Sequence, residues 1–204
     1  MKLILSSCDF LNERSTKVIL DNLDKNIKEC KILFIPNEKA TYEKIHSDKY
    51  YKRVEEYGFA RENVYVFDES NSDEFRNLDL DVIYVGGGNT FATIDKIRKC
   101  NFDKDIVDYI NNGVIYIGGS CGAHILTKNI EHLLIFDDNY VGIKDFDALG
   151  LFDGIIIPHC GCPEYKPELR EELYTRLVSE NKYNVYKLTN DESLLVSEDD
   201  IIRM

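Results

Sequence analysis

Residues 114–123 read VIYIGGSCGA, and this stretch decides the fold class. Its first four residues are apolar on both faces, which predicts a strand covered on both sides. A glycine-rich turn and a helical segment follow, so Ser120 stands in a G-x-S-x-G motif between a strand and a helix. Small flanking residues permit the tight turn that holds a serine hydroxyl above a sheet, facing the N–H groups of the next helix. The stretch therefore predicts a nucleophile elbow centred on Ser120.

Similar strand and helix patterns alternate along the rest of the chain. Further short apolar runs, predicted as strands, lie at residues 3–6, 31–35, 64–67, 82–85 and 155–157. Helical patterns separate them at residues 15–26, 41–57, 90–99, 104–112 and 168–180. This alternation predicts an α/β fold with a doubly wound, mostly parallel sheet and helices on both faces.

The C-terminal stretch predicts shorter strands. They are expected at residues 185–188, 194–196 and 200–202, as a small antiparallel edge. No repeat or linker interrupts the pattern, so residues 1–204 are expected to form a single domain. In such sheets ligands bind where strands end at their carboxyl side, and the site is expected there.

Composition limits the classes of partner. The net charge of −12 argues against nucleic acid and anionic membranes, which need clustered Lys and Arg. The chain contains no apolar run of about 18 residues, so no membrane span is predicted. Six scattered cysteines are typical of free thiols in a reducing cytoplasm. The charge does not exclude a small anionic substrate, and the chain is expected to be a monomer or a homodimer.

A second glycine turn follows the predicted strand 82–85. Residues 86–91 read GGGNTF, which matches neither a P-loop nor G-x-G-x-x-G. Backbone N–H groups of Gly87 or Gly88, together with that of Cys121, would form an oxyanion hole. The alternative is a simple turn with a helix cap from Asn89 or Thr90.

A histidine follows the strand 155–157. His159 is well placed to meet a serine at the same edge of the sheet, and neutral imidazole is the usual base for a hydroxyl nucleophile. The spacing of His159, Cys160 and Cys162 is too tight for an ordinary zinc site, so no metal is expected. Asp137 and Asp138 are both candidates for the partner of the imidazole, since they lie between the serine and the histidine in the chain, and Asp145 and Asp147 are the fallbacks.

Two rival hypotheses remain. One is a cysteine-dependent, amidotransferase-like enzyme with Cys121 as nucleophile, since a thiolate at a helix N-terminus is acidified. The other is a non-catalytic binding module on the same fold.

Four motifs together resemble the peptidase E family of aspartyl dipeptidases, at residues 86–90, 116–123, 146–151 and 157–159. The similarity runs from about residue 3 to about residue 196. It implies serine peptidases with a class I glutamine amidotransferase-like fold, which cleave dipeptides with an N-terminal aspartate through an acyl-enzyme, without metal or cofactor.

The resemblance also assigns residues. It matches Ser120 to the nucleophile, His159 to the base and Asp137 to the acidic member. Gly88 and Asn89 match the glycine turn near the substrate, and Arg170 matches an arginine that reads the aspartyl side chain. The chain departs from the pattern at Gly119, where a larger residue is often found, at Cys121, where alanine is common, and at residues 160–162.

Overall fold

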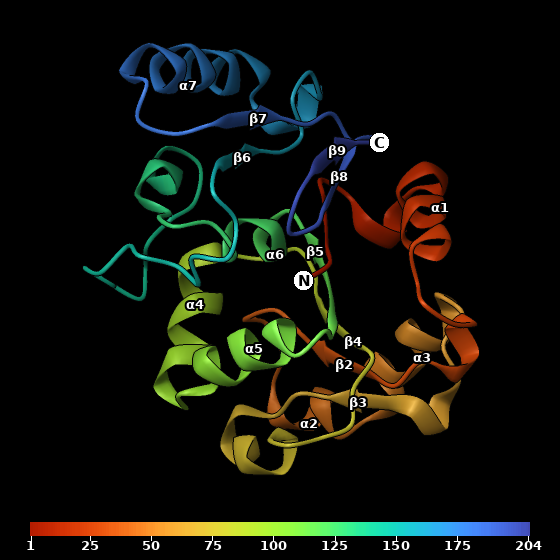
Figure 1. The fold of residues 1–204 in the computed structure, drawn as a ribbon. Coiled ribbons are helices and arrows are strands. Elements are labelled where there is room, and N and C mark those ends of the chain that lie inside the picture. The colour runs from red at the N-terminus through yellow and green to blue at the C-terminus, as the bar shows by residue number, and fades with distance from the viewer.

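The computed structural model describes residues 1–204 and contains a seven-stranded central sheet (Figure 1). Its strands are β1 (Leu3–Ser6), β2 (Ile32–Ile35), β3 (Val64–Val66), β4 (Val82–Val85), β5 (Ile115–Gly119), β8 (Ser193–Val196) and β9 (Ile201–Arg203). They lie in the order β3-β2-β4-β5-β1-β8-β9. The first five are parallel, whereas β8 and β9 form an antiparallel edge. The predicted doubly wound, mostly parallel sheet is confirmed.

The other two strands form a separate parallel pair. They are β6 (Ile155–Ile157) and β7 (Val185–Lys187). Residues 185–188 were expected at the antiparallel edge, so this expectation is wrong. The apolar face of β6 and β7 instead packs under the last helix, through Ile155, Ile157, Leu173 and Leu177.

Seven α-helices and six 3-10 turns connect the strands. The helices are α1 (Glu13–Asp21), α2 (Tyr42–Ile45), α3 (Asp48–Glu56), α4 (Thr90–Lys99), α5 (Phe102–Asn111), α6 (Cys121–His124) and α7 (Pro167–Glu180). The 3-10 turns are η1 (Asp9–Leu11), η2 (Ile27–Glu29), η3 (Arg61–Asn63), η4 (Glu69–Phe75), η5 (Glu131–Ile135) and η6 (Pro163–Tyr165). The helix expected over 41–57 is divided, because Ser47 caps a new helix by accepting from the N–H of Lys49. None of the helices is both long enough and apolar enough to cross a membrane.

Alternate residues of each central strand enter different cores. Leu3 and Leu5 of β1 pack in the core shared with α4 and α5, whereas Ile4 packs in the core shared with α1 and α3. The two helix layers lie on opposite sides of the sheet (Figure 1). This arrangement follows from the period of two along a strand, and both faces are apolar because both are covered.

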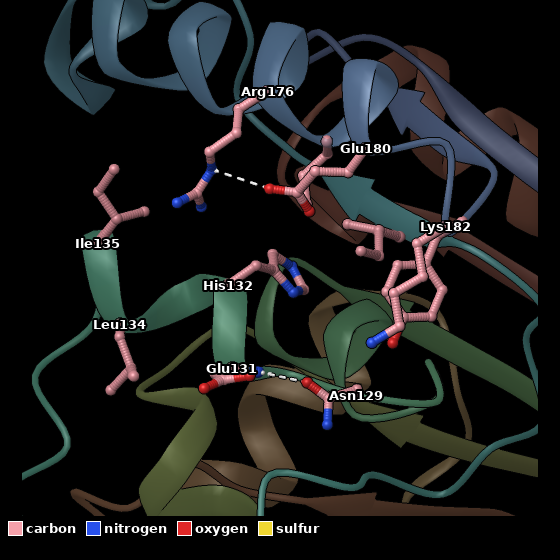
Figure 2. A pocket seen from close by; sticks show the side chains of 11 residues that line it. Asn129, Glu131, His132, Leu134, Ile135, Arg176, Glu180 and Lys182 are labelled. Atoms are coloured by element: carbon pink, nitrogen blue, oxygen red, sulfur yellow. Dashed lines mark hydrogen bonds and ion pairs between the residues drawn. The ribbon is translucent and has the colours of Figure 1, made fainter.

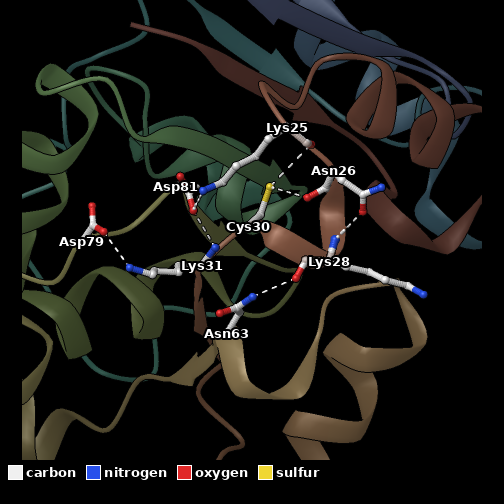
Figure 3. A network of polar contacts seen from close by, with 8 residues as sticks. All are labelled: Lys25, Asn26, Lys28, Cys30, Lys31, Asn63, Asp79 and Asp81. Carbon is white, nitrogen blue, oxygen red and sulfur yellow. Dashed lines mark hydrogen bonds and ion pairs between the residues drawn. The ribbon is translucent and has the colours of Figure 1, made fainter.

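A polar network closes the amino-terminal edge of the sheet (Figure 3). Asp81, just before β4, accepts a hydrogen bond of 2.7 Å from the backbone N–H of Lys31, just before β2. The same carboxylate pairs with Lys25 at 2.8 Å. These contacts fix the start of two neighbouring strands, so the carboxyl ends of the strands reach the opposite edge in register.

Candidate active site

Three neighbouring strands end together at the carboxyl edge of the sheet. The register pairs Val85 of β4 with Gly118 of β5, and Gly119 of β5 with Ser6 of β1. The segments that follow these strands line a cavity of about 310 Å³. Six of the eight predicted site residues line it, namely Gly87, Gly88, Ser120, Asp137, His159 and Arg170.

Ser120 occupies a strained turn at the mouth of α6. Its φ of 48° and ψ of −102° fall outside the regions that a serine ordinarily adopts. Two glycines permit this turn, because a Cβ on Gly122 would overlap the carbonyl oxygen of Val85 and a Cβ on Gly119 would overlap the carboxylate of Asp9. The G-x-S-x-G sequence thus produces the geometry of a nucleophile elbow.

His159 lies against the Ser120 hydroxyl. Its Nε2 is 3.2 Å from Ser120 Oγ, and its Nδ1 is 2.8 Å from Oδ1 of Asn190. The ring stacks on Tyr165 at 4.0 Å between centroids, and the backbone N–H of His159 donates to Ser7 Oγ. The imidazole is therefore held on three sides.

The surroundings of His159 favour a neutral ring. Burial lowers the pKa of His159 below its usual 6.5, the hydrogen bond with Asn190 opposes this shift, and the charge of Arg170 adds to it. Because Asn190 Oδ1 can only accept, the proton of the neutral ring is assigned to Nδ1. Nε2 then presents its lone pair to the Ser120 hydroxyl, which is the arrangement that a general base requires.

The structure corrects the predicted partner of the imidazole. Asp137 lines the cavity, but its Oδ2 accepts from the backbone N–H of Thr90 at 3.1 Å, and it makes no hydrogen bond with His159. Asp138 is exposed, and its carbonyl oxygen accepts from Asn89. The orienting position is filled by Asn190, which comes from the turn between β7 and β8.

Cys121 lies behind the elbow. Its side chain is 0% exposed, and burial raises the pKa of its thiol to about 12. Such a thiol is protonated near neutral pH and faces the core, which disfavours the hypothesis of a Cys121 nucleophile. Its backbone N–H, by contrast, belongs to the first residue of α6, directly after Ser120.

Only part of the glycine turn after β4 faces the cavity. Gly87 faces the nucleophile, since a Cβ on it would lie 4.0 Å from Ser120 Cβ. Asn89 lies outside the cavity: its side chain caps α4 by accepting from the N–H of Ala92 at 2.9 Å and donates to the carbonyl of Asp138. The structure thus gives Asn89 the capping position that was the alternative to substrate contact.

Arg170 of α7 points into the cavity. It is 7% exposed, and its guanidinium lies 4.3 Å from the ring centre of Phe136. Nε donates to the carbonyl of Tyr165 at 2.6 Å, but Nη1 is buried without a partner, and no carboxylate pairs with this side chain. Burial lowers the pKa of Arg170. A buried guanidinium with a free N–H has the chemistry to bind an anion.

A larger cavity, of about 560 Å³, lies between η5 and α7 (Figure 2). Its lining includes Arg176, Glu180 and His132, but no serine, threonine or cysteine. Burial lowers the pKa of His132 to about 4. The cavity lacks a serine, threonine or cysteine beside its histidine, so the smaller cavity at Ser120 is the candidate active site.

Two residues of the site were not predicted. Asn190 stands in a turn without a recognisable motif, and Asp9 lies three residues after the end of β1. Asp9 could have been found, because sites gather at the carboxyl ends of strands and this rule applies to β1 as it does to β4 and β5.

The chain is similar to known peptidases in sequence and in fold. The family model of peptidase family S51 matches residues 2–204. An uncharacterized peptidase of Listeria monocytogenes is 28% identical over 189 residues, which cover 90% of each chain. Peptidase E of Citrobacter koseri is 38% identical over 103 residues, which cover 49% of this chain and 44% of that protein. The crystal structure of a candidate peptidase E from Listeria monocytogenes superposes with a TM-score of 0.78 at 26% identity, covering 100% of this chain and 97% of the other.

Proposed function

Because the chain belongs to peptidase family S51 and is a serine peptidase of the peptidase E type, we propose that it hydrolyses short peptides at Ser120 through an acyl-enzyme. The observation that carries this proposal is the 3.2 Å contact between Ser120 Oγ and His159 Nε2, on a strained turn at the mouth of a cavity. A hydroxyl in this position needs only a base and an oxyanion site to attack an amide.

In the proposed reaction, Ser120 Oγ attacks the scissile carbonyl carbon while His159 Nε2 takes the hydroxyl proton. The oxyanion is bound by the backbone N–H of Cys121 and by that of Gly87 or Gly88. His159 then protonates the leaving amine, and the C–N bond breaks to leave an ester on Ser120. Water hydrolyses the ester by the same route, with His159 returning the proton to Ser120 Oγ.

We assign the orienting role to Asn190 in place of Asp137. An amide oxygen on Nδ1 selects the tautomer that the reaction needs, as in the Cys-His-Asn arrangement of other peptidases. A neutral amide does not stabilise the imidazolium by charge, so the burial of His159 keeps its pKa low. The proposed base is thus ready to accept a proton even in mildly acidic solution.

The proposed substrates are peptides with an acidic N-terminal residue, above all aspartate. The support is Arg170, whose buried Nη1 has no partner beside the cavity that contains Ser120. A side-chain carboxylate of the substrate would supply the missing acceptor in a charge-assisted hydrogen bond. We place the enzyme in the cytoplasm, since all six cysteines are free thiols.

Labelling with a fluorophosphonate tests the nucleophile. The wild-type protein and the Cys121→Ser variant are expected to be labelled and to hydrolyse Asp-Leu, whereas Ser120→Ala loses both properties. Cys121→Ser is a matched control, because it changes the adjacent buried side chain with little change of volume. Labelling that survives in Ser120→Ala and disappears in Cys121→Ser would overturn the proposal and favour the cysteine-dependent rival.

A further inference from the structure

Asp9 is a buried carboxyl group in the wall of the Ser120 cavity. It begins η1, three residues after the end of β1, and is 3% exposed. Its backbone has a φ of 41°, and its N–H donates to Ser6 Oγ at 2.8 Å. The carboxylate packs against Gly119 in the space that a side chain at position 119 would occupy. It therefore lies beside the residue that precedes Ser120.

No cation of the chain pairs with this carboxyl group. Oδ1 is buried without a hydrogen-bond partner. The groups around it are the Tyr84 hydroxyl on β4, Tyr57 after α3, the thiol of Cys8 and, acting through its charge, Arg53 of α3. Burial raises the pKa of Asp9 to about 7, although hydrogen bonds from the Tyr84 hydroxyl and the backbone N–H of Phe10 and the charge of Arg53 oppose this shift. A buried carboxylate that pairs with no cation and leaves one oxygen without a hydrogen bond is costly, so this wall of the cavity is suited to a cation from outside.

We propose that Asp9 binds the α-ammonium group of the N-terminal residue of the peptide substrate. This inference rests on the proposed function. In a peptide cleaved after its first residue, the α-nitrogen lies about 2.5 Å from the scissile carbonyl carbon. The ammonium group must therefore bind close to Ser120, and the carboxyl group of Asp9 lies against the neighbouring Gly119.

Asp137 is the other carboxylate in the cavity, and it is less suited to this position. One of its oxygens is occupied by the N–H of Thr90, and its charge acts on Arg170. Asp137 thus belongs to the side of the cavity that holds the guanidinium. With Asp9 by the elbow and Arg170 on α7, the cavity carries both charges needed for an N-terminal residue that bears an ammonium and a carboxylate.

The test compares two substrates that differ only in the amine. Aspartyl-p-nitroanilide carries the ammonium group, and succinyl-p-nitroanilide keeps the carboxylate but lacks it. In the Asp9→Asn variant, kcat/KM for the first is expected to fall about 100-fold, the scale for loss of one partner of a buried charge pair, and for the second to change little. Asp138→Asn, which removes an exposed carboxylate near the cavity, is expected to leave the ratio of the two substrates unchanged. An equal loss on both substrates would overturn the proposal and leave Asp9 as a support of the elbow.

A binding experiment makes the inference independent of hydrolysis. L-aspartate and succinate are titrated into the wild-type protein at pH 6.5 in buffers of different ionisation enthalpy. Aspartate is expected to bind more tightly and to release a proton, because the ammonium group ionises a carboxyl group whose pKa is about 7. Equal or undetectable binding of the two ligands would overturn the proposal. Tighter binding of aspartate without any peptide hydrolysis would refute the proposed function and leave the ammonium site standing.

Discussion

Replacing Asn190 with aspartate puts a negative charge on the Nδ1 side of the proposed base. In the wild-type protein Asn190 Oδ1 is 2.8 Å from His159 Nδ1, and a carboxylate of nearly the same shape can keep this contact. The hydrogen bond and the tautomer of His159 are therefore conserved, and apart from the charge the variant loses only the 3.3 Å contact that Asn190 Nδ2 donates to Cys162 Sγ. The variant isolates the electrostatic part of the orienting role.

The size of the effect follows from the short distance. An opposite charge this close favours the protonated ring and raises a histidine pKa by about 1–3 units. His159 must be neutral to act as a base, so activity is lost as the pH falls through its pKa. In the wild-type protein burial holds that pKa below 6.5, and in Asn190→Asp the acid limb is expected to move upward by about 1–3 pH units. Near pH 6 the Asn190→Asp variant is therefore expected to be less active than the wild-type protein.

The measurement is the pH dependence of kcat/KM for Asp-Leu, which reports ionisations of the free enzyme. Asn26→Asp is the matched control, because it adds the same charge at the amino-terminal edge of the sheet, where Asn26 caps η2 and aspartate caps equally well (Figure 3). Its acid limb should coincide with that of the wild-type protein. Asn190→Ala, which removes the acceptor, should lower kcat by about 10- to 100-fold. An acid limb that stays in place in Asn190→Asp would refute the assignment of Asn190.

Three further predictions concern recognition and stability. Arg170→Met should lower kcat/KM for Asp-Leu relative to Ala-Leu, by a factor that corresponds to about 2–5 kcal/mol of lost discrimination. An unchanged ratio would exclude a role of Arg170 in reading the acidic side chain. Asp81→Ala should lower the free energy of unfolding in urea by about 1–3 kcal/mol, because the backbone N–H of Lys31, just before β2, loses its acceptor. Asp79→Ala is the control: this carboxylate is 94% exposed, and its removal should change the free energy of unfolding by less than about 1 kcal/mol. Gly119→Ala should lower the free energy of unfolding by about 1–3 kcal/mol, and part of this loss should disappear when Asp9→Ala is added. If the changes in unfolding free energy of the two single variants simply add up in the double variant, the two side chains do not compete for space.

Most of the central sheet could be predicted because its strands obey one simple rule. β1, β4 and β6 have the predicted bounds, since buried parallel strands are apolar on both faces and are flanked by turn residues. The helix expected over 41–57 was divided by the local cap at Ser47, and residues 185–187 pair with β6 instead of the sheet edge. Pairing between strands far apart in the sequence depends on which apolar faces meet in space, and the pattern within one strand does not specify that.

The residues of the candidate site also fall into those that the sequence could predict and those that it could not. Ser120 and His159 could be predicted as candidates because each lies within two residues of the end of a strand, which sets its place. Asn190 could not, because its contact with His159 depends on the turn between β7 and β8, and the choice between it and Asp137 is one of distance.

Gly119 shows most clearly what the sequence alone leaves hidden. A small residue here departs from the family pattern, and in the sequence it indicates only a missing side chain. In the structure the space is filled by Asp9, which is brought there because β1 pairs with β5 in a register that sets Ser6 opposite Gly119. The absence of a side chain at Gly119 therefore makes room for the Asp9 carboxyl group beside the nucleophile. A side chain at 119 and a carboxylate at 9 exclude each other, so we expect relatives with a larger residue at position 119 to bind the substrate amine differently.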